Sequence, residues 1–326
     1  MAKARAIVKR RKAVRNIRKI TKTMQMIATA KFQKSLKRAV GSKPYTLKLR
    51  EVAAEVVKSV GEGEVKHPLL RQPGDLKAGS RVAIVVLTSN RGLAGAYNGH
   101  VLRTGYAFVR EHLGKGCKID LYVAGKKGAS FFKFQKVPIT QFVKTSDPPK
   151  YSEVNPLAEE LMARFADGTY DAVFVAYMNF ISTGVQKPTV NALLPVSGIR
   201  DVAESLAREV AEKAAQAKAG VMDAKRRGDD VTVEAVEHAK AVYEFSPGPV
   251  ELLGELLPLA VKTALFQSFL DATTSEHVAR MVAMKSATDN AEKMGKALTM
   301  QYNRARQSQI TTELSEIMGG VEAMKG

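Results

Sequence analysis

The residues with the clearest chemical potential form a glycine-rich turn after a short apolar stretch in the middle of the chain. Residues 88–98 read Thr-Ser-Asn-Arg-Gly-Leu-Ala-Gly-Ala-Tyr-Asn. A glycine turn that leads from a strand into a helix can hold phosphate on the first amides of the helix. However, Gly92, Gly95 and Gly99 lack the G-x-G-x-x-G spacing, and the chain contains no G-x-x-x-x-G-K-[ST] sequence. We therefore expect a close-packed strand-to-helix turn in preference to a nucleotide site.

Residue types that ligate metals or act in catalysis are dispersed along the chain. The histidines form no H-E-x-x-H sequence and no pair at helical spacing, so they do not predict a metal site. They are His67, His100, His112, His238 and His277. No nucleophile-elbow sequence surrounds Ser89, Ser182 or Ser197. The sequence predicts no catalytic site, no metal and no cofactor in this chain.

The charge of the chain is concentrated in one segment. Of 51 Lys and Arg and 32 Asp and Glu residues, residues 1–50 contain 17 basic and no acidic ones, which leaves 34 basic and 32 acidic residues elsewhere. The net charge of +19 therefore resides almost entirely in the first 50 residues. Such a segment would neutralise phosphates in a salt-dependent manner, so a nucleic-acid-binding protein is one alternative.

Two further features bear on the location of the protein. Cys117 is the only cysteine, which excludes an internal disulfide and favours a reducing compartment. No stretch approaches the roughly 20 consecutive apolar residues of a membrane span, and the basic start lacks the apolar core of a signal peptide.

Residues 1–60 predict a long helix that needs a partner. Apolar residues recur at spacings of four and three, which is typical of a helix packed along another helix. They are Ala13, Ile17, Ile20, Met24 and Ile27. Because basic residues occupy the other faces without acids to pair with them, this helix repels itself when alone. Pro44 predicts a kink or an interruption.

Residues 250–326 predict a second, longer helix. After Pro258, which fits a first turn, no proline follows. The predicted seam consists of Leu259, Phe266, Leu270, Thr273, His277, Met284, Ala287, Ala291, Met294 and Leu298. About 60 helical residues form a rod of roughly 90 Å, which is too long for the inside of a compact domain. The two terminal helices are expected to pack as an antiparallel coiled coil.

The end of the second helix carries apolar residues that the first helix does not cover. They are Ile310, Leu314, Ile317, Met318 and Val321. We expect this run to form an apolar tip that is seated in a partner protein.

Residues 76–199 have the pattern of a different domain. Short β-branched runs alternate with amphipathic patterns, which is the rhythm of βαβ units and predicts a mostly parallel sheet. The runs lie at 82–87, 119–123, 172–176 and 189–195, and the helical patterns near 98–113 and 153–166. The sequence Gly-Lys-Lys-Gly at 125–128 is expected to be a solvated turn.

Residues 200–244 predict a helical hairpin that is broken near Gly228. The fold class is therefore mixed α+β and α/β, with a long antiparallel coiled coil and a Rossmann-like domain. The expected parts are a coiled-coil helix at 1–60, the α/β domain at 76–199, a helical insert at 200–244 and a coiled-coil helix at 250–326.

Both ends of the chain contain distinctive sequences. Near the C-terminus these are SEHVARMVAMKSATDNA at 275–291, YNRARQ at 302–307 and ITTEL at 310–314. The N-terminal part contains KITKTMQMIA at 19–28 and KPY at 43–45, and the glycine turn reads SNRGLAG at 89–95. Together they closely resemble the gamma subunit of rotary F-type ATP synthases.

The resemblance implies a central-stalk rotor subunit without a catalytic site of its own. In this family the paired terminal helices form a shaft inside a ring of three alpha and three beta subunits. The α/β domain forms the foot beside the epsilon subunit and the ring of c subunits. Proton flow turns the shaft, which drives the nucleotide sites on beta through their binding states during ATP synthesis.

The resemblance also implies a location. It begins essentially at residue 1, which disfavours a transit peptide. We expect a peripheral protein at the cytoplasmic face of a bacterial inner membrane, without direct insertion and without nucleic acid as a partner.

The same resemblance implies contact residues. Lys19, Lys22 and Met24 are expected to meet an acidic loop of beta at the neck of the shaft. The residues expected to face the ring on the upper shaft are Arg280, Arg306, Gln307, Thr311 and Glu313. The alternative for each is a solvated face of the coiled coil. Asn90 stands where the family usually has an acid, and residues 200–244 contain no cysteine for thiol control.

Other hypotheses stay open at this point. Besides nucleic-acid binding, a nucleotide-dependent enzyme on the α/β domain is a third class. Residues 200–244 are hypothesised to act as a brake on reverse rotation. The sequence leaves open the coupling ion, the number of c subunits, the individual foot contacts and the favoured direction of rotation.

Overall fold

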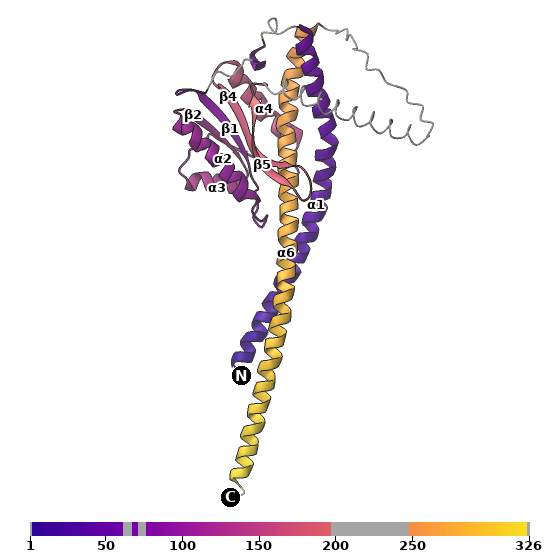
Figure 1. The fold of residues 1–326 in the computed structure, drawn as a ribbon, viewed down its shortest axis with the longest axis vertical. Coiled ribbons are helices and arrows are strands. Elements are labelled where there is room, and N and C mark those ends of the chain that lie inside the picture. Colours follow the sequence, from indigo (N-terminus) through magenta and orange to yellow (C-terminus); the bar gives the residue numbers. More distant parts are fainter. Residues whose placement is uncertain (1, 61–66, 71–75, 197–247, 325–326) are drawn as a thin grey trace, which may run out of the picture. The chain divides into compact units, whose positions relative to one another are not determined.

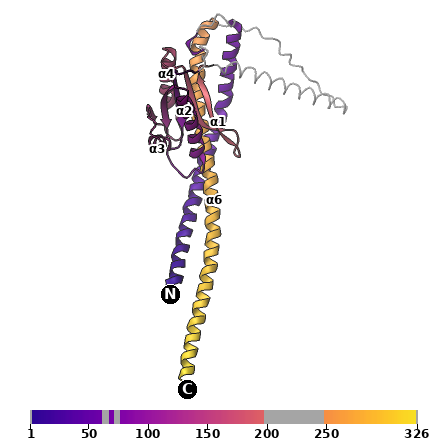
Figure 2. The same cartoon turned by 60° about the vertical axis from the view of Figure 1, so that its left-hand side comes forward.

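The computed structural model describes residues 2–60, 67–70, 76–196 and 248–324, which fall into two compact units (Figure 1, Figure 2). The coiled-coil unit comprises Met1–Ser35, Arg91–Tyr97 and Thr274–Gly326. The α/β unit comprises Leu36–Asn90 and Asn98–Thr273. The predicted helical insert at 200–244 lies outside the described residues.

Two long helices contribute to both units, which confirms the predicted pair of terminal helices. α1 spans Ala2–Val60 and α6 spans Pro249–Ala323. Within each unit they lie side by side and antiparallel (Figure 1). α6 begins before Pro258, the expected first-turn residue, because Leu253 and Leu257 are fully buried and offset the amide hydrogen bond that the proline lacks.

Pro44 lies inside α1 without ending it, so of the two predicted outcomes, a kink or an interruption, the interruption is excluded. A proline removes the hydrogen bond to the carbonyl oxygen four residues earlier, here that of Val40, which weakens the preceding turn of the helix. Here Gln267 of α6 donates from Nε2 to the carbonyl oxygen of Ala39 at 3.3 Å. Ser42 donates from Oγ to Gln267 Oε1 at 2.6 Å. Side-chain hydrogen bonds from α6 therefore support α1 where the sequence pattern alone predicts a break.

The α/β unit contains a five-stranded sheet in the order β3-β2-β1-β4-β5. Its strands are β1 (Arg81–Leu87), β2 (Lys118–Ala124), β3 (Gln141–Val143), β4 (Ala172–Phe180) and β5 (Gln186–Leu194). All neighbours are parallel except β4 and β5, which confirms the mostly parallel sheet. The predicted helices are α2 (Tyr97–Gly114) and α4 (Tyr151–Ala166). A short 3-10 helix, η1, spans Pro68–Leu70.

Helices cover both faces of this sheet (Figure 1). Ala83, Val85 and Leu87 of β1 share a core with α4 and with the parts of α1 and α6 in this unit. On the other face, Val86 contacts Gly105 of α2 and Val123 contacts Gly128 of α3 (Lys126–Phe134). Because β1 is buried on both faces, it reads as a continuous apolar run.

The segment 125–128 is the start of α3, and the expectation of a solvated turn is wrong. Gly125 precedes the helix with a φ of 93°, a conformation that favours glycine. Gly128 is buried in the helix, and its amide donates to Thr88 Oγ1 at 2.9 Å. The two glycines let α3 approach β1 and β2 closely, whereas the sequence pattern shows only two lysines between glycines.

One helix in the described part of the chain, α6, has a stretch whose length and composition would allow it to cross a membrane. The sequence nevertheless contains no run of about 20 consecutive apolar residues here, because Glu255 and Lys262 interrupt the apolar part of this helix. Within this stretch, 44% of the residues are buried inside the protein, as in the core helices of globular proteins, which meet the same criterion. The finding is consistent with a core helix.

Gly128→Ala tests the close packing of α3. A Cβ at this position would lie 2.7 Å from both Thr88 Oγ1 and Val123 Cγ1, so we expect the free energy of unfolding to fall by about 1–3 kcal/mol. Gly254→Ala in α6 is the control, because a Cβ there meets nothing within 4 Å and alanine favours helix by about 1 kcal/mol. Urea denaturation of the full chain measures both, and equal effects would contradict the packing argument.

Candidate partner-binding surface on the terminal helices

In the coiled-coil unit, several of the buried residues of α1 and α6 are small or polar. On α1, Val14, Thr21, Ala28 and Ser35 are buried at a seven-residue repeat, and the larger Phe32 is buried between the last two. On α6, Met284, Thr288 and Ala291 are buried. Thr288 donates from Oγ1 to Thr21 Oγ1 at 2.9 Å, which satisfies both hydroxyls inside the seam. A seven-residue period is that of a left-handed coiled coil, and small residues bring the two backbones close.

The predicted seam on α1 is wrong by about one position. Ile17, Ile20 and Ile27 are 52%, 59% and 53% exposed. Thr21 and Ala28, which follow two of them, are buried instead. Periodicity predicts the spacing of an apolar stripe, but it cannot tell whether the stripe faces α6 or another protein.

The predicted seam on α6 is confirmed at four positions, Leu270, His277, Met284 and Ala291. Met294 is 55% exposed and does not belong to it. Further along, the helices meet through exposed groups. Arg18 Nη2 lies 2.9 Å from Glu292 Oε2, and the Arg11 guanidinium lies 5.1 Å from the ring centre of Tyr302. Exposed pairs of this kind contribute about 0–1 kcal/mol each, so this end of the helix pair is only weakly stabilised from within.

Seven of the eight predicted contact residues lie at the surface of the coiled-coil unit. Lys19 and Lys22 are exposed and Met24 is half-buried. Arg306, Gln307, Thr311 and Glu313 are all exposed. Thr311 Oγ1 donates to the carbonyl oxygen of Gln307 at 3.0 Å, and Glu313 accepts from Gln309 at 2.8 Å.

The structure does not bring these residues to one site. Thr21, which lies between the two lysines, pairs with Thr288, and residue 306 is 18 residues further along α6. That separation corresponds to about 27 Å of helix. The two groups therefore form two patches at different heights of the coiled coil.

Arg280 differs from the other predicted contacts because its side chain is buried. It is 9% exposed, and Nη2 lies 2.6 Å from Glu276 Oε1. Its remaining contacts are carbonyl oxygens of the glycine turn at Arg91 and Gly92, each at 3.4 Å. This geometry does not favour direct contact with a partner.

Exposed apolar residues lie on both helices, and those of α1 are not among the predicted contacts. Ile17, Ile20, Met26 and Ile27 form such a stripe on α1. The predicted apolar tip of α6 is also exposed, with Ile310, Leu314, Ile317, Met318 and Val321 between 49% and 64% accessible. Apolar surface gathered along one element is typical of a protein interface. In the sequence, Ile17, Ile20 and Ile27 follow the spacing of three and four residues that predicts the internal seam, so the stripe is visible in the sequence but its partner is not.

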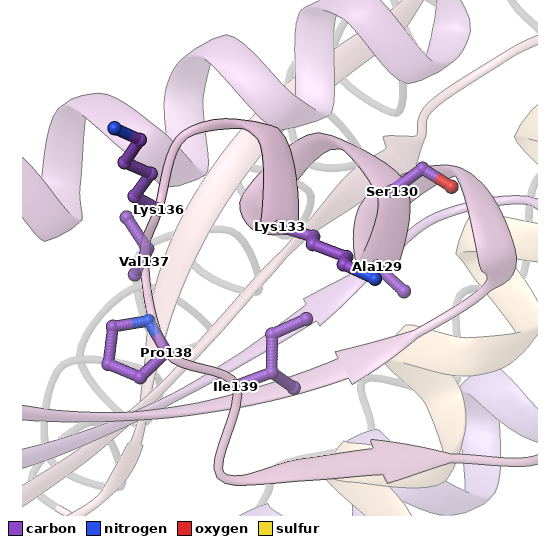
Figure 3. Close-up of a pocket in the computed structure, with 7 residues that line it drawn as sticks. All are labelled: Ala129, Ser130, Lys133, Lys136, Val137, Pro138 and Ile139. Atoms are coloured by element: carbon purple, nitrogen blue, oxygen red, sulfur yellow. The ribbon is translucent and has the colours of Figure 1, made fainter.

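The α/β unit has a surface groove beside α3 that is lined by Ala129, Ser130, Lys133, Lys136, Val137, Pro138 and Ile139 (Figure 3). Its volume is about 570 Å³. The lining contains two lysines and no acid, so it offers no acid–base pair for catalysis. Among the described residues no cluster of His, Cys, Asp or Glu could hold a metal ion.

A second cavity, of about 380 Å³, lies between α1, α6 and the strands β4 and β5. Lys43 Nζ lies 3.8 Å from Asp271 Oδ1 and donates to the carbonyl oxygen of Phe180 at 3.1 Å. The Asp271 side chain is 4% exposed and accepts a hydrogen bond from Gln267 at 3.0 Å. Burial raises the pKa of Asp271 to about 6, against the opposing effects of Lys43 and of that hydrogen bond. Burial therefore dominates over the ion pair.

Comparison with known proteins places the chain in a family. The family described as ATP synthase matches residues 3–324. An ATP synthase gamma chain of Rhodopirellula baltica is 39% identical over 327 residues and covers 100% of both chains. One from Leptospira biflexa is 36% identical over 325 residues, which is 99% of this chain and 100% of the relative.

Solved structures support the fold. A chain of the Euglena gracilis mitochondrial ATP synthase, from an OSCP/F1/c-ring structure, superposes with a TM-score of 0.59 at 17% identity and covers 99% of this chain and 95% of its own length. The fold described above is therefore that of an ATP synthase central stalk. The chain belongs to the ATP synthase gamma-chain family.

Val14→Asn tests the observed seam on α1. Val14 is 9% exposed, so an unpaired amide there should lower the free energy of unfolding of the full chain by about 1–3 kcal/mol. Ile17→Asn, at the predicted but exposed position, is the matched control and should change it by less than about 0.5 kcal/mol. Urea unfolding followed by helical circular dichroism measures both. The opposite ranking would restore the predicted seam.

Asp271→Asn tests the burial of the carboxyl group. Because the folded pKa lies above the ordinary value of 3.8, the native state binds the proton more tightly than the unfolded state. This group's contribution to stability is therefore greatest below about pH 4 and falls as the pH rises to about 6. The neutral amide should raise the free energy of unfolding by about 3 kcal/mol at pH 8 and change it by less than about 1 kcal/mol at pH 4.

The exposed Asp289→Asn is the control for this measurement and should show no such dependence on pH. Urea denaturation of the full chain at both pH values gives the result. A loss of stability in the Asp271→Asn variant at pH 8 would mean that attraction to Lys43 outweighs burial.

Proposed function

We propose that this chain is the rotor shaft of the central stalk in a proton-driven ATP synthase. It couples rotation of a membrane ring to conformational change at nucleotide sites on beta subunits. The observation that carries the proposal is the surface of the coiled-coil unit, where a stripe of large apolar residues on α1 and the apolar tip of α6 are exposed. A helix pair that worked alone would bury those side chains, so this surface fits a shaft enclosed by other proteins.

The partners of the proposed shaft follow from the family and from the surface. Three alpha and three beta subunits surround the helices, and the epsilon subunit and the c-ring contact the α/β unit. The Euglena structure, which includes F1 and a c-ring, supports these partners. The family assignment gives no support to the nucleic-acid alternative.

Seven surface residues are the proposed direct contacts with the ring; six are exposed and Met24 is half-buried. Lys19, Lys22 and Met24 meet an acidic loop at the neck, while Arg306, Gln307, Thr311 and Glu313 act higher on the shaft. An exposed charge pair contributes about 0–1 kcal/mol, so each contact can break during every turn. Arg280 acts indirectly, through the glycine turn that its side chain contacts.

In this proposal the chemistry of ATP belongs to other subunits. The glycine turn supports that view, because it lacks the spacing of a phosphate-binding loop and Gly95 lies near Ala283 of α6. The bacterial relatives support a peripheral position at the cytoplasmic face of an inner membrane. The four-part organisation at 1–60, 76–199, 200–244 and 250–326, with the insert as a brake, remains an interpretation of the sequence.

Reconstitution tests both the function and the neck contacts. Purified chain added to its cognate alpha and beta subunits should produce an ATPase whose activity depends on it. The double variant Lys19→Glu with Lys22→Glu should lower that activity about 5- to 30-fold, because it reverses two contacts with an acidic loop. The same charge change at the exposed Lys77 and Lys118 of the α/β unit is the control and should leave the rate unchanged.

The two possible failures have different meanings. If the chain did not stimulate the alpha and beta subunits at all, the rotor assignment would be wrong. If it did, but the neck variant matched the control, only the assignment of Lys19 and Lys22 would be lost.

A further inference from the structure

The glycine turn after β1 belongs to the coiled-coil unit, although its neighbours in the chain do not. Arg91–Tyr97 groups with Thr274–Gly326, whereas Asn90 and Asn98 group with the α/β unit. The backbone of the turn is left-handed at Leu93, with a φ of 62°, and at Gly95, with a φ of 55°. A non-glycine residue in this region is costly, so neighbouring groups must hold the turn in place.

One face of α6 supplies the surface on which the turn packs. A Cβ at Gly95 would lie 3.7 Å from the Cβ of Ala283 and 3.9 Å from the carbonyl oxygen of Ala279. Ala94 and Tyr97 are 2% and 3% exposed. Burial, together with the nearby charge of Glu276, raises the pKa of the Tyr97 hydroxyl. Small side chains on both sides therefore allow close contact between the turn and the helix.

The side chain of Arg280 binds backbone carbonyl groups of the glycine turn. Nε and Nη2 of Arg280 each lie 3.4 Å from the carbonyl oxygen of Gly92, and Nη2 lies 3.4 Å from that of Arg91. The same Nη2 donates to Glu276 Oε1 at 2.6 Å, one helical turn away. A planar guanidinium with five donors can serve a carboxylate and two carbonyls together, whereas the ammonium of lysine is a compact charge. Glu276 thereby orients the arginine toward the turn.

We propose that Arg280 is a positioning residue that fastens residues 91–97 to α6 and gives the rotor a second path for torque. The backbone runs from the turn into β1 on one side and forward into α2 on the other. Torque on the α/β unit therefore reaches the coiled-coil unit through this attached turn as well as along α1 and α6. The inference rests on the proposed rotor function. It assigns Arg280 a role within the chain, which is to hold the backbone of residues 91–97 against α6.

A disulfide that replaces the arginine tests this role. Arg280→Gln removes the guanidinium, and Gly95→Cys with Ala283→Cys places two thiols where the Cβ separation of 3.7 Å suits a disulfide. Because Gly95 has a φ of 55°, a cysteine there is strained, so the chain with the cysteine pair and an intact Arg280 is the reference. The chain carrying all three changes is assembled into the membrane-reconstituted synthase and measured oxidised and reduced. The readouts are ATP hydrolysis, ion pumping per ATP hydrolysed and hydrogen exchange of the amides of residues 91–97.

We expect Arg280→Gln to speed amide exchange in the turn on the order of ten-fold, because charge-assisted hydrogen bonds are lost. Ion pumping per ATP should fall, and Glu276→Gln, which leaves the arginine in place, should produce a smaller loss of the same kind. Oxidation of the cysteine pair should restore pumping, and a reductant should reverse the restoration. Ala283→Cys alone should not respond to oxidation, and the exposed Lys285→Gln should behave as the unmodified chain.

Two results would overturn the inference. If amide exchange in the turn did not change on loss of the guanidinium, Arg280 would not fasten it. If the disulfide formed but pumping stayed low, Arg280 would act on a partner directly. In both cases a complex that still assembles and hydrolyses ATP with this chain would leave the rotor function intact.

Discussion

The structure depends on the need of a strongly basic helix for a partner. The first 50 residues contain no acid, so α1 cannot balance its own charge along its surface. Packing against α6 stabilises α1 in spite of this charge, because the pair buries a seam that includes Val14, Ala28 and Met284. Several residues in this seam, such as Thr21 and Ala28, are small, which brings the two backbones close. Many larger apolar residues of both helices, Ile20 and Leu314 among them, remain outside and available to other proteins.

A few polar side chains adapt the long helices to sequences that would otherwise interrupt them. Gln267 and Ser42 hydrogen-bond around the turn that precedes Pro44. Asp271 is buried beside Lys43 although burial disfavours its charge. Thr21 and Thr288 satisfy each other within the seam. Each group is acceptable inside the protein because it has a hydrogen-bond partner, and each specifies how α1 and α6 align.

Much of the fold could be predicted from periodicity. The seam of α6 at His277 and Ala291 was found from its spacing, as were four strands of the sheet. Three elements, η1, β3 and α3, were missed, the last two for separate reasons. β3 has only three residues, Gln141–Val143, which is too short for a pattern of alternation. α3 begins at a glycine pair whose purpose is close packing on Thr88, and that contact is not visible in the local sequence.

By itself the sequence determined the type and order of the elements, the concentration of positive charge and the family, since these are properties of residue spacing and identity. Tertiary structure alone decided which face of α1 meets α6, because Ile20 and Thr21 lie on neighbouring faces and either periodicity fits a helix. It also decided that Arg280 turns inward to Glu276 and Gly92. From the sequence alone, a charged residue in a helix is expected to face solvent. Arg280 is buried instead because the turn at Arg91 and Gly92, far away in the sequence, provides carbonyl groups that bind it.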